Sequence, residues 1–148
     1  MRVYIGSDHA GWTLKKTVID HVRSLGHEVV DVGSFDEKPV DFPDIAREVA
    51  RKVTSGEVER GIMVCGTGVG ASIAANKMKG IRAAVCHDIH SAHQSVEHDD
   101  VNVMCIGAQI VGPWLAQDLV SSYLSATFST DEDFRRRVDK LHAMDAEG

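Results

Sequence analysis

A cysteine followed by a run of glycines is the stretch of this sequence with the clearest chemical potential. An apolar run over residues 62–64 ends at Cys65, and the turn that follows, residues 66–70, contains three glycines. A glycine-rich turn between a strand and a helix exposes backbone N–H groups at the positive end of the helix dipole, where they bind phosphates or developing oxyanions. The same dipole favours the thiolate of a cysteine at the rim of the turn. The stretch therefore predicts an anion cradle beside a nucleophile or base.

Two other interpretations of this stretch stay open from the residues alone. A cysteine at the end of a buried strand is commonly structural. The turn also fits the dinucleotide-binding pattern G-x-G-x-x-A, and Asp88 follows about 20 residues later. That pattern usually follows the first strand of its domain, whereas this turn lies in the middle of the chain. The turn is not a P-loop, because no Gly-Lys-Ser/Thr follows it.

A second candidate lies near the N-terminus, where the first apolar run ends in Gly-Ser-Asp-His-Ala-Gly. Asp8 could accept hydrogen bonds from sugar hydroxyls and His9 could donate to an anion. The alternative is that Asp8 only caps the helix that follows.

Four histidines, at positions 87, 90, 93 and 98, lie close together in the chain. On a helix the first three spread around about a third of the circumference, so they do not converge on one metal ion. We therefore expect no metal site, and expect His90 and His93 on a solvated helix face. His98 lies at the end of this helical stretch, ahead of the last strand, where it could act as an acid or base.

The composition excludes several classes of protein. The 148 residues are 43% apolar and 26% charged, which suits one globular domain over residues 1–148. A net charge of −6 disfavours a non-specific nucleic-acid binder. No apolar run approaches the roughly 20 residues of a membrane span, and because the first residues already form a strand-like run, we expect no signal peptide. The three cysteines lie at the ends of apolar runs or within them, so we expect reduced thiols and a cytoplasmic protein.

Strand-like runs alternate with helical patterns along the chain. The strands are expected at Val3–Gly6, Glu28–Val32, Gly61–Cys65, Ala83–Cys86 and Val103–Ile106, and the helices at 10–25, 42–54, 69–78, 88–97, 112–125 and 131–143. This alternation predicts an α/β fold with a parallel sheet and helices on both faces. In such a sheet, ligands bind outside the carboxyl ends of the strands.

Four motifs occur in order: Gly-Ser-Asp-His-Ala-Gly, Cys-Gly-Thr-Gly-Val-Gly-Ala-Ser-Ile-Ala-Ala-Asn-Lys, Gly-Ile-Arg-Ala-Ala-Val-Cys and Glu-His-Asp-Asp-Val-Asn-Val. With them the chain resembles, over nearly its whole length, the type B ribose-5-phosphate isomerase family, which includes galactose-6-phosphate isomerase subunits. The resemblance implies a Rossmann-like three-layer α/β/α sandwich with a five-stranded parallel sheet, and no metal or organic cofactor. It also implies a homodimer with sites across the interface, and a C-terminal helix over residues 131–148 that packs on the partner. Whether dimers pair into tetramers stays open.

The resemblance implies aldose–ketose isomerisation of a sugar phosphate and assigns the roles. Cys65 matches the base that moves a proton between C1 and C2, and Thr67 helps to handle protons beside it. The loop that holds the enediolate oxygen matches Gly66, Thr67, Gly68, Val69 and Gly70. Some members use a glutamate base at the position of Ala71, so the alanine here favours the cysteine mechanism.

The resemblance also assigns the ring-opening and phosphate-binding groups. His98 matches the residue that opens the furanose ring, with Asp8 assisting, and His9 and Arg137 match phosphate contacts. At further binding positions this chain departs from the family pattern, with Asp99 for an asparagine and Gln109 for an arginine.

Two more departures lie at the start of the last helix, where Asp133 and Phe134 replace an arginine and a histidine. Thr130 and Asp133 also fit a local capping box. Fewer cations weaken a phosphate pocket, so the alternative is an isomerase of a different or unphosphorylated sugar. The rival from another class is a non-catalytic sugar-binding paralogue, but the retention of Cys65, Thr67 and His98 argues against it.

Overall fold

Alternating side chains of the strands build two separate cores. In β1 (Arg2–Ser7), Val3 and Ile5 pack on one face of the sheet and Tyr4 packs on the other. The remaining strands are β2 (Glu28–Gly33), β3 (Arg60–Cys65), β4 (Ala83–Val85) and β5 (Val103–Gly107). Because the strands have a core on each face, the central ones appear in the sequence as continuous apolar runs, which is typical of a parallel sheet between helices.

The order of the strands determines where a ligand site can form. The computed structural model, which describes residues 1–56 and 60–148, has one parallel sheet in the order β2-β1-β3-β5-β4. The chain moves outward from β1 to β2 and then returns to the other side of β1 with β3. The strand order therefore reverses between β1 and β3, and the crevice at their carboxyl ends is the expected binding place of a doubly wound fold.

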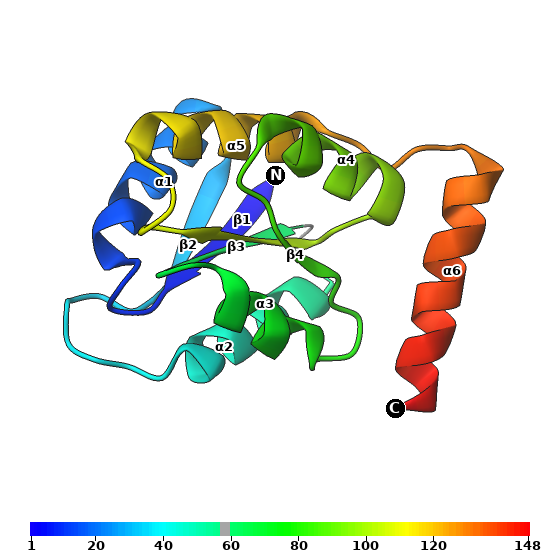
Figure 1. Ribbon diagram of the computed structural model, residues 1–148, viewed down its shortest axis with the longest axis horizontal. Coiled ribbons are helices and arrows are strands. Elements are labelled where there is room, and N and C mark those ends of the chain that lie inside the picture. Colours follow the sequence, from blue (N-terminus) through cyan, green and yellow to red (C-terminus); the bar gives the residue numbers. More distant parts are fainter. Residues whose placement is uncertain (57–59) are drawn as a thin grey trace.

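Helices cover both faces of the sheet. One layer contains α1 (Trp12–Ser24), α4 (Ile89–Asp99) and α5 (Pro113–Ser125), and the other contains α2 (Phe42–Thr54) and α3 (Val69–Asn76) (Figure 1). The resulting three-layer α/β/α sandwich, with five parallel strands, confirms the fold class expected from the sequence. None of the helices in the described ranges has the length and apolar character needed to cross a membrane.

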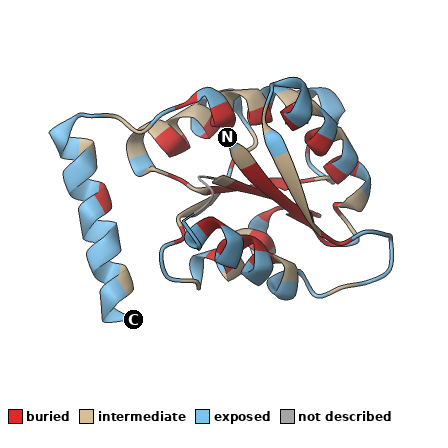
Figure 2. Cartoon of the chain, turned by 180° about the vertical axis from the view of Figure 1, so that it is seen from behind, coloured by how far each residue is buried: buried red, intermediate tan, exposed pale blue. Residues whose placement is uncertain are grey.

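The last helix, α6 (Glu132–Glu147), stands apart from the two layers (Figure 1). Its surface is mostly exposed, in contrast to the strands (Figure 2). Val138 is its only buried residue, while Leu141 and Met144 are exposed.

The observed elements match the expected ones to within a few residues. The largest difference is at α6, which runs four residues beyond the expected end at position 143. It begins after Asp131, whose side chain accepts a hydrogen bond from the Asp133 N–H at 2.8 Å, so Asp131 and not Thr130 is the N-cap. Gly26 and Gly56, each directly after the C-cap of a helix, have positive φ angles, as does Gly80.

Candidate active site

The thiol of Cys65 lies at the end of β3 under the glycine turn. The Gly68 N–H donates a hydrogen bond to Cys65 Sγ at 3.0 Å, and Cys65 is only 5% exposed. Gly68 is the N-cap of α3 and has a φ of 82°. A side chain there would be strained and would also approach the backbone of Cys105 to 3.3 Å. The sequence thus places a backbone donor and the start of a helix directly at the sulfur.

The end of β5 holds this turn in place. Gly107 pairs with Cys65 in the sheet, and a Cβ at Gly107 would lie 2.6 Å from the Thr67 Cα, so no side chain fits. The Ala108 N–H donates to the Cys65 carbonyl at 2.7 Å and the Gln109 N–H to the Gly66 carbonyl at 3.0 Å. The Gln109 side chain lies over Gly66, because a Cβ on that glycine would come within 3.3 Å of its amide group. Gln109 therefore belongs to the rim of the glycine turn.

Asp8 and His9 lie at the neighbouring end of β1. Asp8 is 8% exposed, and its Oδ1 accepts a hydrogen bond from the Gly11 N–H at 3.0 Å. The N-cap of α1 is Gly11, so Asp8 braces the turn before the helix and does not cap the helix itself. A Cβ on Gly11 would lie 2.0 Å from the Val64 carbonyl oxygen, so this turn packs directly on β3 beside Cys65. His9 is exposed and its Nδ1 accepts from the Val40 N–H at 3.2 Å.

His87 joins the same edge of the sheet. The Gly107 N–H donates to His87 Nε2 at 2.9 Å. Burial lowers the pKa of His87, which favours the neutral ring that this bond requires. No role for His87 is predicted from the sequence, although its place just after β4 puts it at the carboxyl ends of the strands, where a ligand site is expected. The contact depends on β5 lying between β3 and β4, which the sequence does not reveal.

A second group of predicted residues lies at the opposite edge of the sheet. His98 and Asp99 form the end of α4, just before β5 begins at Val103. Cys65 pairs with Gly107, the last residue of β5. The four steps from Val103 to Gly107 span about 13 Å at roughly 3.3 Å per residue. Within one chain the structure does not bring His98 to Cys65.

His98 lies against α6 and beside its own neighbour Glu97. The His98 and Phe134 rings are stacked, with centroids 3.9 Å apart and planes 9° apart. Glu97 Oε1 lies 3.8 Å from His98 Nε2, and Arg137 Cζ lies 5.6 Å from the Phe134 ring centroid. The site residues assigned to this edge, His98, Asp99 and Arg137, thus stay near one another.

The two arginines before Arg137 have other partners. Arg135 Nε donates to the Ser129 carbonyl at 2.8 Å, and Arg136 pairs with Asp133 at 2.7 Å. Arg137 makes no ion pair with any residue in the described ranges. It is the cation of this helix turn that is most available to a ligand.

The structure does not support the interpretation of the glycine turn as a dinucleotide-binding site. Asp88 caps α4 by accepting from the Ser91 N–H at 2.7 Å, a bond that lowers the pKa of Asp88. The preceding strand, β4, is separated from β3 by β5, so Asp88 is not placed to bind a ribose beside the glycine turn.

Two of the histidines of α4 lie on its solvated face. His90 is exposed and His93 pairs with Glu97, as expected from the sequence. Over residues 1–56 and 60–148, no group of three or more His, Cys, Asp or Glu is arranged to hold a metal ion.

A thiol beneath an oxyanion-binding turn, at the switch point of a doubly wound sheet, is typical of an enzyme that stabilises an anionic intermediate. The chain belongs to the ribose/galactose isomerase family, whose model matches residues 3–141. It is therefore an aldose–ketose isomerase, an intramolecular oxidoreductase.

Three relatives illustrate the similarity. The ribose-5-phosphate isomerase B of Escherichia coli is 41% identical over 144 residues, with 97% of this chain and 96% of the relative covered. The D-erythrulose-4-phosphate isomerase of Pectobacterium atrosepticum is 40% identical, with 86% and 85% covered. The solved structure of Clostridium thermocellum ribose-5-phosphate isomerase B has a TM-score of 0.96 and 44% identity, with 99% of both chains covered.

Proposed function

We propose that this chain is a cofactor-independent isomerase of the ribose 5-phosphate/ribulose 5-phosphate type, with Cys65 as the base. The observation that carries the proposal is the hydrogen bond from the Gly68 N–H to Cys65 Sγ at the start of α3. The bond places the sulfur beside a backbone donor and the start of a helix, where it is positioned to act as a base on a weakly acidic C–H. Cys86 and Cys105 have no such role, because burial raises the pKa of both thiols.

The reaction moves one proton from C2 to C1 and a second from O2 to O1, and the carbonyl group thereby shifts from C1 to C2. The Cys65 thiolate removes the proton from C2 of the open-chain aldose, and the electrons of that bond form the C1–C2 double bond of an enediolate. Backbone N–H groups of residues 66–70 stabilise its negative oxygen, an effect worth typically 3–4 kcal/mol per key donor. Cys65 returns the proton to C1, and Thr67 helps the O2 proton to pass to O1. The product carries its carbonyl at C2.

We further propose that each working site is shared between two copies of the chain. Cys65, Thr67, Asp8 and His9 lie at one edge of the sheet, whereas His98 and Arg137 belong to the other. A two-fold dimer would place the His98 edge of one copy over the Cys65 edge of the other. In this arrangement residues 1–148 form one isomerase domain and α6, with its single buried residue, packs on the partner.

Mixed dimers test the shared site. Chains carrying Cys65→Ala and chains carrying His98→Asn are co-expressed with different tags, and the mixed dimer is isolated. Each parent dimer should be inactive on ribose 5-phosphate. The mixed dimer should recover about half of the wild-type rate, because one of its two sites combines two intact halves. An inactive mixed dimer would contradict the sharing.

The residues of the anion pocket favour a second candidate substrate. Gln109, Asp133 and Phe134 leave Arg137 and His9 as the main groups for an anion. Because a relative at 40% identity is a D-erythrulose-4-phosphate isomerase, a sugar phosphate other than ribose 5-phosphate is that candidate. The deciding experiment compares kcat/KM for ribose 5-phosphate, erythrose 4-phosphate, galactose 6-phosphate and free ribose. The substrate with the highest value identifies the activity, and a highest value for ribose 5-phosphate supports the primary proposal.

A further inference from the structure

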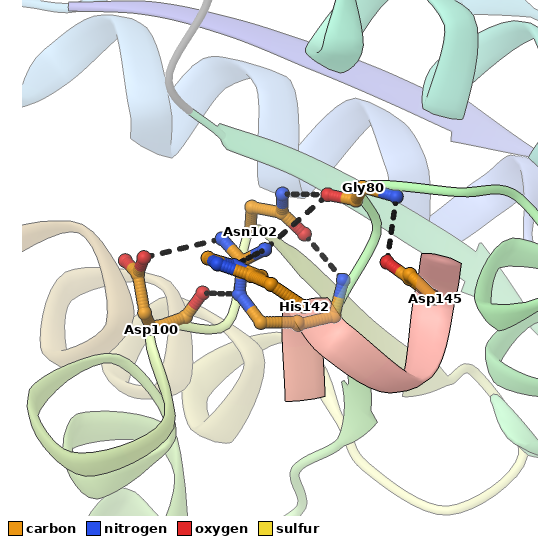
Figure 3. A network of polar contacts seen from close by, with 6 residues as sticks. Gly80, Asp100, Asn102, His142 and Asp145 are labelled. Atoms are coloured by element: carbon orange, nitrogen blue, oxygen red, sulfur yellow. Dashed lines mark hydrogen bonds and ion pairs between the residues drawn. The ribbon is translucent and has the colours of Figure 1, made fainter. Parts of the chain in front are cut away.

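A network of polar contacts joins α6 to the start of β4 and the end of α4 (Figure 3). Arg82, whose side chain is 17% exposed, is at its centre. Its Nε donates to the Asp100 carbonyl at 2.6 Å and a terminal nitrogen donates to the Asp100 carboxylate at 3.2 Å. The other terminal nitrogen donates to His142 Nε2 at 3.2 Å. One guanidinium group therefore bonds to both segments that carry the His98 edge of the site.

The contact with Asp100 fixes how α4 ends. Asp100 is the C-cap of α4 and has a φ of 51°, the only positive φ of a non-glycine residue in the described ranges. A residue with a side chain occupies this region at a cost, so its surroundings must hold it there. Arg82 binds both the carbonyl and the carboxylate of Asp100, and His98 lies only two residues earlier. A change at Arg82 is thus transmitted to the last turn of α4.

The contact with His142 fixes the direction of α6. This helix buries Val138 alone, so apolar packing on its own chain constrains it weakly. Near its start, Phe134 stacks on His98. About two turns further on, His142 bonds to Arg82, and about three turns on Asp145 accepts from the Gly80 N–H at 2.9 Å. In Figure 3, His142 and Asp145 point from α6 toward Gly80 and Asn102.

Asn102 completes the support of Arg82. Its Oδ1 accepts from the Arg82 backbone N–H at 2.8 Å and its Nδ2 donates to the Gly80 carbonyl at 2.9 Å. The loop before β4 is thereby tied to the residue before β5. Arg82 projects from a braced backbone and can act as a fixed point for both helices.

We propose that Arg82 is a positioning residue that holds the end of α4 and α6 as one unit, so that His98 and Arg137 meet the substrate in a fixed geometry. This inference rests on the proposed function, in which these two groups serve the site of a second copy. Arg82 itself does not contact the reacting atoms. Its effect is therefore exerted on the partner's Cys65 edge and not on its own.

The first test is an Arg82→Met variant, which keeps the apolar stem and removes the five donors. Its kcat/KM for ribose 5-phosphate should fall about 10²-fold, the usual scale for a misplacement of about 1 Å. Arg51→Met is the matched control, since Arg51 makes an exposed ion pair with Glu48 on α2. It should leave the rate unchanged. An Arg82→Met dimer with wild-type kinetics would overturn the inference.

Substitutions of His142 test the positioning role without disturbing the fold, because His142 is exposed and does not belong to the core. His142→Leu removes the acceptor and should raise KM through Arg137 more than it lowers kcat. His142→Gln keeps an oxygen acceptor for Arg82 and should restore KM. Equal kinetics of the Leu and Gln variants would contradict the role of this contact, even if Arg82→Met fails to fold.

Mixed dimers decide which site Arg82 serves. A dimer of one Cys65→Ala chain and one Arg82→Met chain should recover about half of the wild-type rate, as one site then has two intact halves. If it stays inactive while the Cys65→Ala/His98→Asn dimer recovers, the Arg82 inference is wrong and the shared site stands. If both mixed dimers stay inactive, the shared-site proposal fails. Where Arg82→Met does not fold, His142→Leu replaces it in the mixture.

Discussion

The imidazole of His98 lies flat against the ring of Phe134, with ring centroids 3.9 Å apart and planes 9° apart. Phe134 replaces a histidine that the family resemblance places at the phosphate. In this chain the position does not supply a charge to an anion. It supplies an aromatic surface that holds the proposed ring-opening histidine in one orientation.

Replacing Phe134 should therefore affect the rate of turnover. A stacked aromatic pair contributes about 0.5–1.5 kcal/mol beyond burial, which corresponds to roughly 2–10-fold in rate. We expect kcat for ribose 5-phosphate to fall by about this factor in Phe134→Ala. Phe134→His keeps a ring and should retain most of kcat. Steady-state kinetics measure the effect, and Phe128→Ala is the control, because Phe128 contacts Arg135 at 4.4 Å instead of His98.

Much of the fold could be predicted because local patterns determine it. Residues 62–64 are apolar, Gly68 permits a positive φ, and Asp88 caps α4, so these elements are specified by neighbouring residues. The order of the strands is different. The placement of β5 between β3 and β4 depends on contacts between residues far apart in the sequence, and it creates the bond of His87 to Gly107.

The candidate site was predictable in part for the same reason. Cys65 and Asp8 follow strands that the sequence identifies, and parallel strands end at the same edge. His98 lies in the last turn of a helix that runs back across the sheet, so it reaches the opposite edge. The family resemblance, and not the local pattern, provides the reason to unite it with Cys65. The role of Arg82 could not be predicted from the sequence, because it depends on contacts with Asp100 and His142, which are 18 and 60 residues away.

The anion pocket should be improvable by restoring two cations. Charge-assisted hydrogen bonds contribute roughly 1.5–3 kcal/mol each. Losing two of them weakens binding by about 10²–10⁴-fold if nothing compensates. The double variant Gln109→Arg with Asp133→Arg should raise kcat/KM for ribose 5-phosphate and leave free ribose unaffected. The wild-type enzyme should show a weak KM for ribose 5-phosphate, measured by initial rates.

One result would contradict this prediction directly. A wild-type KM below the millimolar range for ribose 5-phosphate, with no activity on free ribose, would mean that another cation compensates. Arg136 would be the first residue to test, since it pairs with Asp133 and could be released by a ligand.

The base should be identifiable by substitution of the three cysteines. Cys65→Ala should abolish turnover while sugar phosphate still binds and the protein stays folded, because the side chain is small and lies at the edge of the core. Cys86→Ala and Cys105→Ala should keep most of the activity, since burial raises the pKa of both thiols and leaves them protonated. Isomerisation assays and calorimetric binding separate these outcomes. A Cys65→Ala enzyme with a near-normal kcat would contradict the proposal that Cys65 is the base.

Removal of α6 should prevent dimer formation but leave the α/β/α sandwich folded. A chain that ends at Thr130 loses a helix with only one buried residue, so the sandwich should unfold at nearly the same temperature. It should be monomeric and inactive, because Arg137 and the surface that reaches the second copy are gone. Light scattering and activity at the same concentration test both points. An active monomer of either the full-length or the shortened chain would rule out the shared site.

The pH dependence of stability should carry a contribution from His87. Burial holds the pKa of His87 below the ordinary value of about 6.5, and the neutral ring accepts the Gly107 N–H at 2.9 Å. The unfolded chain therefore binds a proton at a higher pH than the folded chain does. The free energy of unfolding is unaffected by this group above about pH 6.5, and it decreases as the pH falls through that value toward the lowered pKa.

His87→Gln keeps an acceptor for Gly107 but does not titrate, so its stability should fall less than that of the wild type between pH 7.5 and 5. Urea unfolding at several pH values measures the difference, with the exposed His90→Gln as control. Parallel stability curves for wild type and His87→Gln would show that this ring does not couple protonation to the loop around Cys65.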